Sequence, residues 1–226
     1  MKAEVEVEIA PFEKIERIDE KHYLIAESYF ARGDYGNAIR EYDLAISTSP
    51  QSELAGSASL RKAECYYNMK NYGEALNLFN ELWESSRDSF LAPEILYGMS
   101  QCYLKQGKIV EAKSVLERLI SSFPGYLQEE RVNYSLGLIQ YYQEKYEQAL
   151  ESFGKADGVY ADYYAARCLE ELNRELQAQA KYKELIDKYP ESELADDALY
   201  GMGETFYRME QYDFAMRKFW DLLTSY

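Results

Sequence analysis

Three cysteines and one histidine are the side chains in this sequence best suited to chemistry. Cys65, Cys102 and Cys168 could form a disulfide or bind a metal, and His22 could act as a base or a ligand. No second histidine is present to complete a nucleophilic triad or a zinc site with His22. The sequence also contains no Asp-x-Asp-x-Asp-Gly calcium loop and no glycine-rich phosphate loop. We therefore predict a protein that is not an enzyme, with no cofactor and no metal.

The helices that carry these residues can be predicted from small residues that recur along the chain. We call these small residues the anchors. The anchors are spaced by 37, 37, 37, 29 and 37 residues: Ala26, Ala63, Ser100, Gly137, Ala166 and Gly203. An alanine stands twelve residues after each anchor: Ala38, Ala75, Ala112, Ala149, Ala178 and Ala215. A large apolar residue stands sixteen residues after each anchor: Tyr42, Phe79, Leu116, Phe153, Tyr182 and Phe219. Small residues let two helices approach closely, and large residues fill the gap beside them. Glycines such as Gly33 and Gly107 indicate a turn between the helices. The pattern predicts six helix–turn–helix hairpins.

The repeat also explains the cysteines. Each of them lies two residues after an anchor, so Cys65, Cys102 and Cys168 are equivalent positions in three different repeats. Equivalent positions are separated by a whole repeat, which excludes a shared disulfide or a common metal site. We predict that all three are free thiols buried as small apolar residues.

This pattern resembles the tetratricopeptide repeat family over about residues 20–226. The matching residues are Leu-Tyr-Gly-Met-Ser-Gln-Cys-Tyr at 96–103, Glu111-Ala112, Leu116 and Pro124. The resemblance implies an all-α, right-handed superhelical solenoid of six repeats. The long spacing, with Pro50–Ala55 and Pro190–Ala195 between repeats, is more similar to bacterial outer-membrane assembly lipoproteins and Tol-Pal-associated proteins. The N-terminal lipid-carrying cysteine of those lipoproteins is absent here.

One spacing departs from the pattern. The interval from Gly137 to Ala166 is 8 residues shorter than the others, about two helical turns. We therefore expect the second helix of repeat four to end early, near Phe153–Gly158, and to leave an irregular joint between repeats four and five.

We divide the chain into an N-terminal extension (1–11), repeats one to four (12–157) and repeats five and six (158–226). We expect the alternating segment Glu4–Ile9 to lie outside the repeats. Because no polar capping helix follows Phe219, we also expect the solenoid to continue past Tyr226 or to pair through its last repeat as a homodimer.

Aromatic residues form a second stripe on the first helix of each repeat. In the family that the chain resembles, this face lines a concave groove in which peptides or partner helices lie. Our candidate partner-binding residues are Tyr97, Arg131, Tyr134, Tyr141, Tyr160, Tyr163, Arg167, Tyr200 and Tyr207. We place the principal site at the joint and expect replacement of both Arg131 and Arg167 by alanine to weaken partner binding at least about tenfold. Two alternatives remain open: the tyrosines pack against the next repeat, and the arginines neutralise carboxylates such as Glu129, Glu130, Glu170 and Glu171.

The charge of the chain limits its partners. The formal net charge is −15 and the pI is about 4.6, which disfavours nucleic acid and anionic membranes. No apolar run approaches the roughly 18 residues needed to span a bilayer. We expect a scaffold that binds a neutral or basic protein segment in its aromatic groove. The alternative is a structural protein that assembles through its repeat ends or belongs to a bacterial envelope complex. The sequence as it stands indicates the cytoplasm, or the bacterial periplasm if a signal segment was removed.

Overall fold

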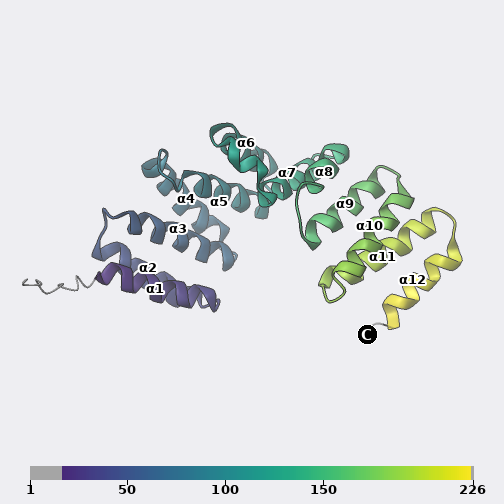
Figure 1. Ribbon diagram of the computed structural model, residues 1–226, viewed down its shortest axis with the longest axis horizontal. Helices are drawn as coiled ribbons and strands as arrows, with labels where there is room; N and C mark the ends of the chain where they lie inside the picture. Colours follow the sequence, from purple (N-terminus) through teal and green to yellow (C-terminus); the bar gives the residue numbers. More distant parts are fainter. Residues whose placement is uncertain (1–16, 225–226) are drawn as a thin grey trace, which may run out of the picture. The chain divides into compact units, whose positions relative to one another are not determined.

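A computed structural model of the chain describes residues 17–224 (Figure 1). The extension expected at 1–11 and the final residues Ser225 and Tyr226 lie outside this range. The described part contains twelve α-helices, one short 3-10 helix and no strand. The elements are α1 (Ile18–Ala31), α2 (Tyr35–Thr48), α3 (Glu53–Asn68), α4 (Tyr72–Ser86), α5 (Ala92–Lys105), α6 (Ile109–Ser122), η1 (Pro124–Gln128), α7 (Glu130–Tyr142), α8 (Tyr146–Phe153), α9 (Val159–Glu171), α10 (Glu175–Lys188), α11 (Glu193–Arg208) and α12 (Tyr212–Thr224). The all-α helical-repeat fold expected from the sequence is confirmed.

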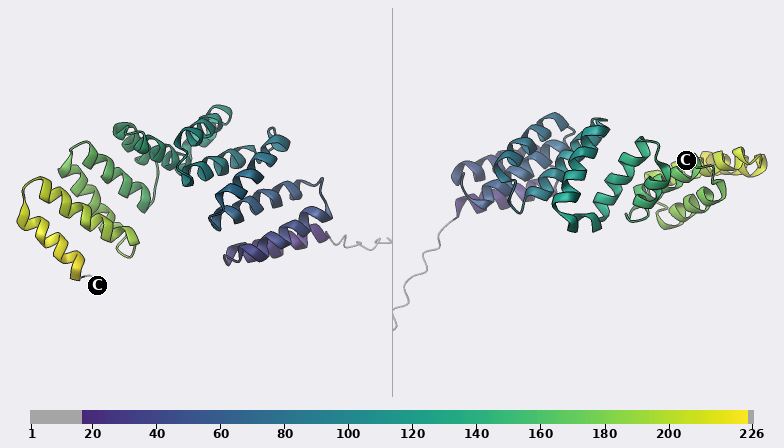
Figure 2. Two further views of the ribbon diagram at one scale, coloured as in Figure 1. Left: turned by 180° about the vertical axis from the view of Figure 1, so that it is seen from behind. Right: turned by 90° about the horizontal axis from the view of Figure 1, so that it is seen from above.

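The chain forms two compact units, one up to Lys70 with α1–α3 and one from Asn71 with α4–α12. Within the second unit, α9, α10, α11 and α12 lie side by side in chain order (Figures 1 and 2). Odd-numbered helices are the first helices of the repeats, and even-numbered helices are the second. The anchors therefore lie on first helices, and the alanines twelve residues later lie on second helices.

The turn between the two helices has the same backbone conformation in every repeat. The residue seven positions after each anchor has a positive φ of 54–75°: Gly33, Lys70, Gly107, Glu144, Asn173 and Glu210. A residue with a side chain adopts this left-handed conformation at a cost of about 1–2 kcal/mol. Four of the six residues at this position are not glycine and adopt the conformation nevertheless. The packing of the two helices therefore determines the turn, and glycine only makes it easier.

The core confirms the predicted roles of small and large residues. The anchors and the six alanines are buried. Where the small residue is glycine, an aromatic ring from a second helix lies directly on the first-helix backbone. A Cβ added to Gly137 would lie 2.6 Å from the ring of Phe153, and one added to Gly201 would lie 2.5 Å from the ring of Tyr182. These separations are too short for a Cβ unless the ring moves, so glycine is strongly favoured at both positions.

The joint between repeats four and five is short, as predicted, and it is well packed. Helix α8 has 8 residues where α6 and α10 have 14, and Gly158 precedes α9 with a φ of 113°. The ring of Phe153 stacks on Tyr164 at a centroid distance of 5.6 Å. Tyr134 and Tyr141 also lie within 6.5 Å of Tyr164. Aromatic rings therefore fill this joint.

We expect Gly137→Ala to lower the free energy of unfolding by about 1–3 kcal/mol, because the buried ring of Phe153 must move to accept a methyl group. Gly73→Ala in α4 is the matched control, since a Cβ there meets no atom within 4 Å. It should be neutral or stabilising by up to about 1 kcal/mol. Urea unfolding followed by circular dichroism measures both. Equal effects of the two substitutions would contradict this account of helix packing.

Candidate functional site

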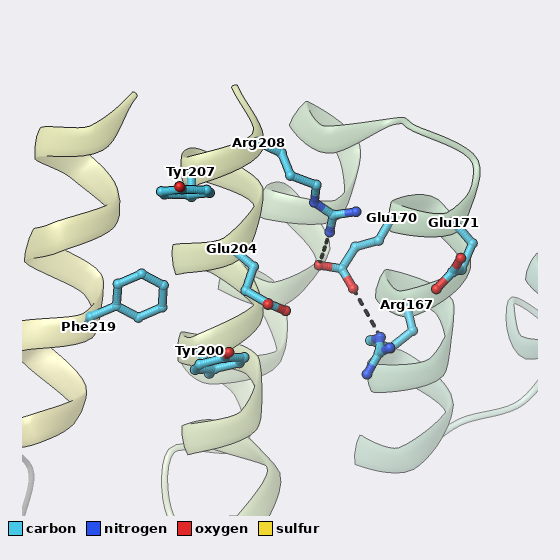
Figure 3. Close-up of a pocket in the computed structure, with 8 residues that line it drawn as sticks. All are labelled: Arg167, Glu170, Glu171, Tyr200, Glu204, Tyr207, Arg208 and Phe219. Atoms are coloured by element: carbon cyan, nitrogen blue, oxygen red, sulfur yellow. Dashed lines mark hydrogen bonds and ion pairs between the residues drawn. The ribbon is translucent and has the colours of Figure 1, made fainter. Parts of the chain in front are cut away.

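A pocket of about 470 Å³ opens between α9, α11 and α12 (Figure 3). Arg167 on α9 and Tyr200 and Tyr207 on α11 line it, and all three are among the predicted binding residues. Phe219 enters from α12. The two tyrosines are seven residues apart, so they lie on one face of α11 at nearly the same angle. The repeat pattern thus places three predicted residues around one cavity.

A buried carboxylate lies at the centre of the pocket. Glu170 is only 4% exposed, and its two oxygens are approached by three groups. The hydroxyl of Tyr182 donates to Oε2 at 3.0 Å, and Nη2 of Arg208 donates to Oε1 at 2.7 Å. The Nε of Arg167 lies 3.0 Å from Oε2 as an ion pair. Burial raises the pKa of Glu170 above its ordinary value, although the hydroxyl and both arginines favour the charged form.

The same arrangement occurs in the first repeat, but it is more open to solvent. The hydroxyl of Tyr42 donates to Oε1 of Glu27 at 2.5 Å, and Arg61 donates to both oxygens of Glu27 at 2.8 and 2.6 Å. The Glu27 side chain is 29% exposed. The hydrogen bonds from Arg61 outweigh the desolvation of Glu27 and hold the pKa of this glutamate below its ordinary value.

The rim of the pocket is aromatic and acidic. Tyr200 is 48% exposed and Tyr207 is 61% exposed. Glu171 and Glu204 are exposed at the rim, and neither forms an ion pair with another described residue. The charge of Glu204 raises the pKa of the Tyr200 hydroxyl. A cationic or hydrogen-bonding group of a ligand would therefore meet carboxylates flanked by tyrosine rings.

The remaining predicted residues do not join this pocket. Arg131 donates to Glu94 at 2.8 and 2.5 Å and to Glu129 at 2.6 Å, and its guanidinium lies 4.6 Å from the centroid of the Tyr97 ring. Glu94 and Glu129 therefore neutralise the charge of Arg131. This is the internal role that the sequence left open for Arg131 beside partner binding. Tyr134 and Tyr141 pack in the aromatic joint described above.

Tyr160 and Tyr163 are on α9, beside the pocket. Tyr163 lies 6.2 Å from the Tyr182 ring and accepts a hydrogen bond from Nη1 of Arg167 at 3.4 Å. Tyr160 is exposed and donates to Glu193 at 2.6 Å. The nine predicted residues therefore form three groups: Tyr97 with Arg131, the rings of the joint, and the surroundings of the pocket.

Sequence reasoning missed Glu170, Arg208 and Phe219 as pocket residues. A signal for Glu170 was present, because only repeats one and five have tyrosine sixteen residues after the anchor. A buried hydroxyl needs an acceptor, and both repeats have glutamates on their first helices, among them Glu27 and Glu170. Arg208 had no comparable signal, because Arg61 and Arg208 occupy different positions relative to their anchors.

The cysteines lie away from this pocket, and their predicted burial is confirmed. All three are buried free thiols. Burial raises the pKa of Cys65, Cys102 and Cys168 to about 12 each. His22 lies 2.6 Å from a carboxylate oxygen of Glu41. Among residues 17–224, no group of histidine, cysteine and acidic side chains could hold a metal ion. In the same part of the chain, no helix is long and apolar enough to cross a membrane.

Hairpins that pack through small anchors on successive first helices define a helical-repeat protein. Family comparison agrees: residues 134–154 and 160–192 match tetratricopeptide repeat models, and residues 32–119 match the family "Anaphase-promoting complex, cyclosome, subunit 3". The chain therefore contains tetratricopeptide repeats and has the fold of proteins built from them. Its predicted resemblance to the lipoprotein and Tol-Pal subgroup stays a prediction.

Solved structures show the same fold at low sequence identity. PilW, described as a widely conserved type IV pilus biogenesis factor, has a TM-score of 0.76 and 16% identity, covering 92% of this chain and 93% of that one. PilF of Pseudomonas aeruginosa has a TM-score of 0.74 and 18% identity, covering 92% of both chains. A tetratricopeptide repeat protein of Parabacteroides merdae has a TM-score of 0.70 and 16% identity, covering 92% of this chain and 80% of that one. No curated protein sequence matches the chain significantly.

The pKa values of Glu27 and Glu170 should shift in opposite directions from the ordinary value of a glutamate. We expect the carboxyl of Glu27 to titrate below 4.5 and that of Glu170 above 4.5. The stability from Glu27 is present above its unfolded pKa and is lost as the pH falls through the folded pKa. The stability from Glu170 is present below its unfolded pKa and is lost as the pH rises through the folded pKa. Carboxyl ¹³C NMR titration, assigned with Glu27→Gln and Glu170→Gln, measures both. The reverse order of the two pKa values would contradict the assigned role of burial.

The thiols should be unreactive and replaceable. Replacement of Cys65, Cys102 and Cys168 together by alanine should preserve the fold and cost about 1 kcal/mol per site or less. In the native protein, a maleimide should label none of them at neutral pH, because burial keeps them protonated. In denaturant, all three should react. Rapid labelling of the folded protein, followed by mass spectrometry, would disprove the burial.

Proposed function

We propose that this protein is an interaction scaffold that binds a peptide or helical segment of a partner protein along the first helices of its repeats. The family and the fold support an interaction scaffold in general terms. One observation carries the more specific proposal: the exposed rings of Tyr200 and Tyr207 lie over a pocket that also contains Arg167. Exposed tyrosines offer contact area and a hydroxyl at small entropic cost, which suits a binding surface.

The partner segment is neutral or basic. Glu171 and Glu204 are carboxylates at the rim that form no ion pair with a described residue. A lysine or arginine of the segment that enters between Tyr200 and Tyr207 would meet both an aromatic face and a carboxylate. The chain as a whole, with a net charge of −15, attracts such a segment over longer distances.

The predicted residues contribute to this surface in different ways. Arg167, Tyr200 and Tyr207 form its centre, and Tyr160 and Tyr163 extend it along α9. Tyr97 and Arg131 continue the face on α5 and α7, whereas Tyr134 and Tyr141 pack in the joint beside it. Arg131 is already held by Glu94 and Glu129, so it positions the Tyr97 ring and offers little free hydrogen-bonding capacity to a partner.

We expect Tyr200→Ala combined with Tyr207→Ala to weaken the binding of the partner at least about tenfold, or 1.4 kcal/mol. The fold should remain intact because both rings are largely outside the core. A photoreactive amino acid at position 200 in the native host identifies the partner, and calorimetry then measures its affinity.

Val110→Ala is the matched control, since Val110 is an exposed apolar residue at the start of α6, outside the pocket. It should leave the affinity unchanged. If the partner binds the double variant as tightly as the parent, or crosslinks equally well from position 110, the pocket is not the binding site.

A further inference from the structure

The outward face of α12 differs from the same face of every other second helix. The residue seventeen positions after each anchor is exposed in all six repeats. In the first five repeats this residue is polar or glycine: Asp43, Asn80, Glu117, Gly154 and Lys183. In the sixth repeat it is Trp220, which is 66% exposed. The position is exposed in five repeats even though another repeat follows each of them. A further repeat stacked in the same way would therefore leave Trp220 uncovered.

A second position on α12 departs from the pattern in the same way. Eleven residues after the anchor, the first five repeats have Asn37, Glu74, Glu111, Gln148 and Gln177. The sixth has Phe214, which is 53% exposed and stacks on Phe206 at a centroid distance of 5.5 Å. The first five repeats have a polar residue or glycine at both positions, so the stacking of one repeat on the next requires neither aromatic side chain. Together with Met216, they line a surface pocket of about 490 Å³.

The charge at this pocket identifies the chemistry of its ligand. Arg217 lies between the two rings in sequence, and its guanidinium is 5.8 Å from the centroid of the Phe214 ring. Arg61, Arg131 and Arg208 all pair with glutamates. Arg217 forms no ion pair within residues 17–224, which is also true of Arg32, Arg40 and Arg118, but it alone of these four lines this pocket. Lys218 and Asp221 neutralise each other at 3.0 Å. The guanidinium of Arg217 therefore lies beside exposed apolar side chains without an ion pair of its own, in an otherwise acidic protein.

We propose that the outward face of α12 is a second docking surface for a segment of a partner protein. An apolar side chain of that segment lies against Trp220 and Met216, and a carboxylate beside it accepts hydrogen bonds from Arg217. The planar guanidinium can donate two parallel hydrogen bonds to a carboxylate. Tryptophan and arginine are also the residues most enriched where binding energy is concentrated.

The occupant is a different protein and not a second copy of this chain. Two copies would each have a net charge of −15 and would repel each other at long range. A partner of neutral or positive net charge that presents a single carboxylate in its docking segment avoids this repulsion and satisfies Arg217.

This surface is independent of the pocket on α9 and α11. Phe219 lines that pocket, whereas Trp220, the next residue, lines this one. Consecutive helical residues differ by about 100° in direction. Substitution of Trp220 therefore changes the second surface and leaves the first pocket complete, so the two proposals can fail separately.

The probe is a library of short random peptides displayed on phage. The library is selected on the full chain in the presence of excess Trp220→Lys protein, so that only peptides requiring Trp220 remain. We expect the selected peptides to share an aspartate or glutamate beside an apolar residue. In fluorescence anisotropy, Arg217→Ala in the protein, or amidation of that carboxylate in the peptide, should each lower the affinity about tenfold or more. Arg217→Lys should fall between the parent and Arg217→Ala.

Lys183→Ala is the matched control, because Lys183 occupies the position in α10 that is equivalent to Trp220. It should leave the affinity unchanged, and circular dichroism should show every variant folded. Three results would overturn the proposal: no peptide selected over Trp220→Lys, selected peptides indifferent to Arg217, or a parent protein that is dimeric in solution and becomes monomeric on Trp220→Lys.

Discussion

The structure depends on the close approach of each second helix to the first helices beside it. A large residue of the second helix fits only where the neighbouring first helix has a small one. At Gly137 and Gly201 the available space excludes even a methyl group. The same contact occurs at Gly98 against Phe79 and at Gly203 against Phe219, and it fixes which residues face the core there. The side chains pointing away from the contact are free to vary, and the binding surfaces of a repeat protein are formed by them.

The charged lining of the pocket arises because repeat five has a tyrosine at the large position of this helix contact. Repeats one and five place tyrosine where the other repeats have phenylalanine or leucine, so a hydroxyl enters the core and requires an acceptor. Glu27 and Glu170 accept it. A carboxylate in such surroundings in turn requires cations, which Arg61 of repeat two supplies to Glu27 and Arg167 and Arg208 supply to Glu170. The charged lining of the pocket is therefore a structural consequence of Tyr182 as well as a potential contact for a ligand.

The sequence predicted the features that depend on local spacing. The anchors, the alanines, the buried cysteines and the early end of α8 all follow from counting residues between small and large side chains. The left-handed turn was visible only at Gly33 and Gly107, because Lys70, Glu144, Asn173 and Glu210 adopt it under the constraint of packing. Glu129 and Glu170 were among the acids that the sequence offered as partners of Arg131 and Arg167, but Glu94, which lies 37 residues before Arg131, was not, because side-chain direction decides the pairing. For the same reason, the division of the nine candidate residues into three groups required coordinates.

Whether the tyrosines of the aromatic stripe pack in the core or stay exposed depends on the repeat in which they lie. Where α8 is short, the rings of Tyr134 and Tyr141 gather around Tyr164 and occupy the space that a longer helix would fill. Burial raises the pKa of Tyr134 to about 12. In repeat six, where 13 residues of the second helix are described, Tyr200 and Tyr207 remain exposed at the equivalent positions. A ring that fills a gap in the core cannot also turn toward a ligand without leaving a cavity. This constraint favours repeats five and six over the joint itself as the centre of partner binding.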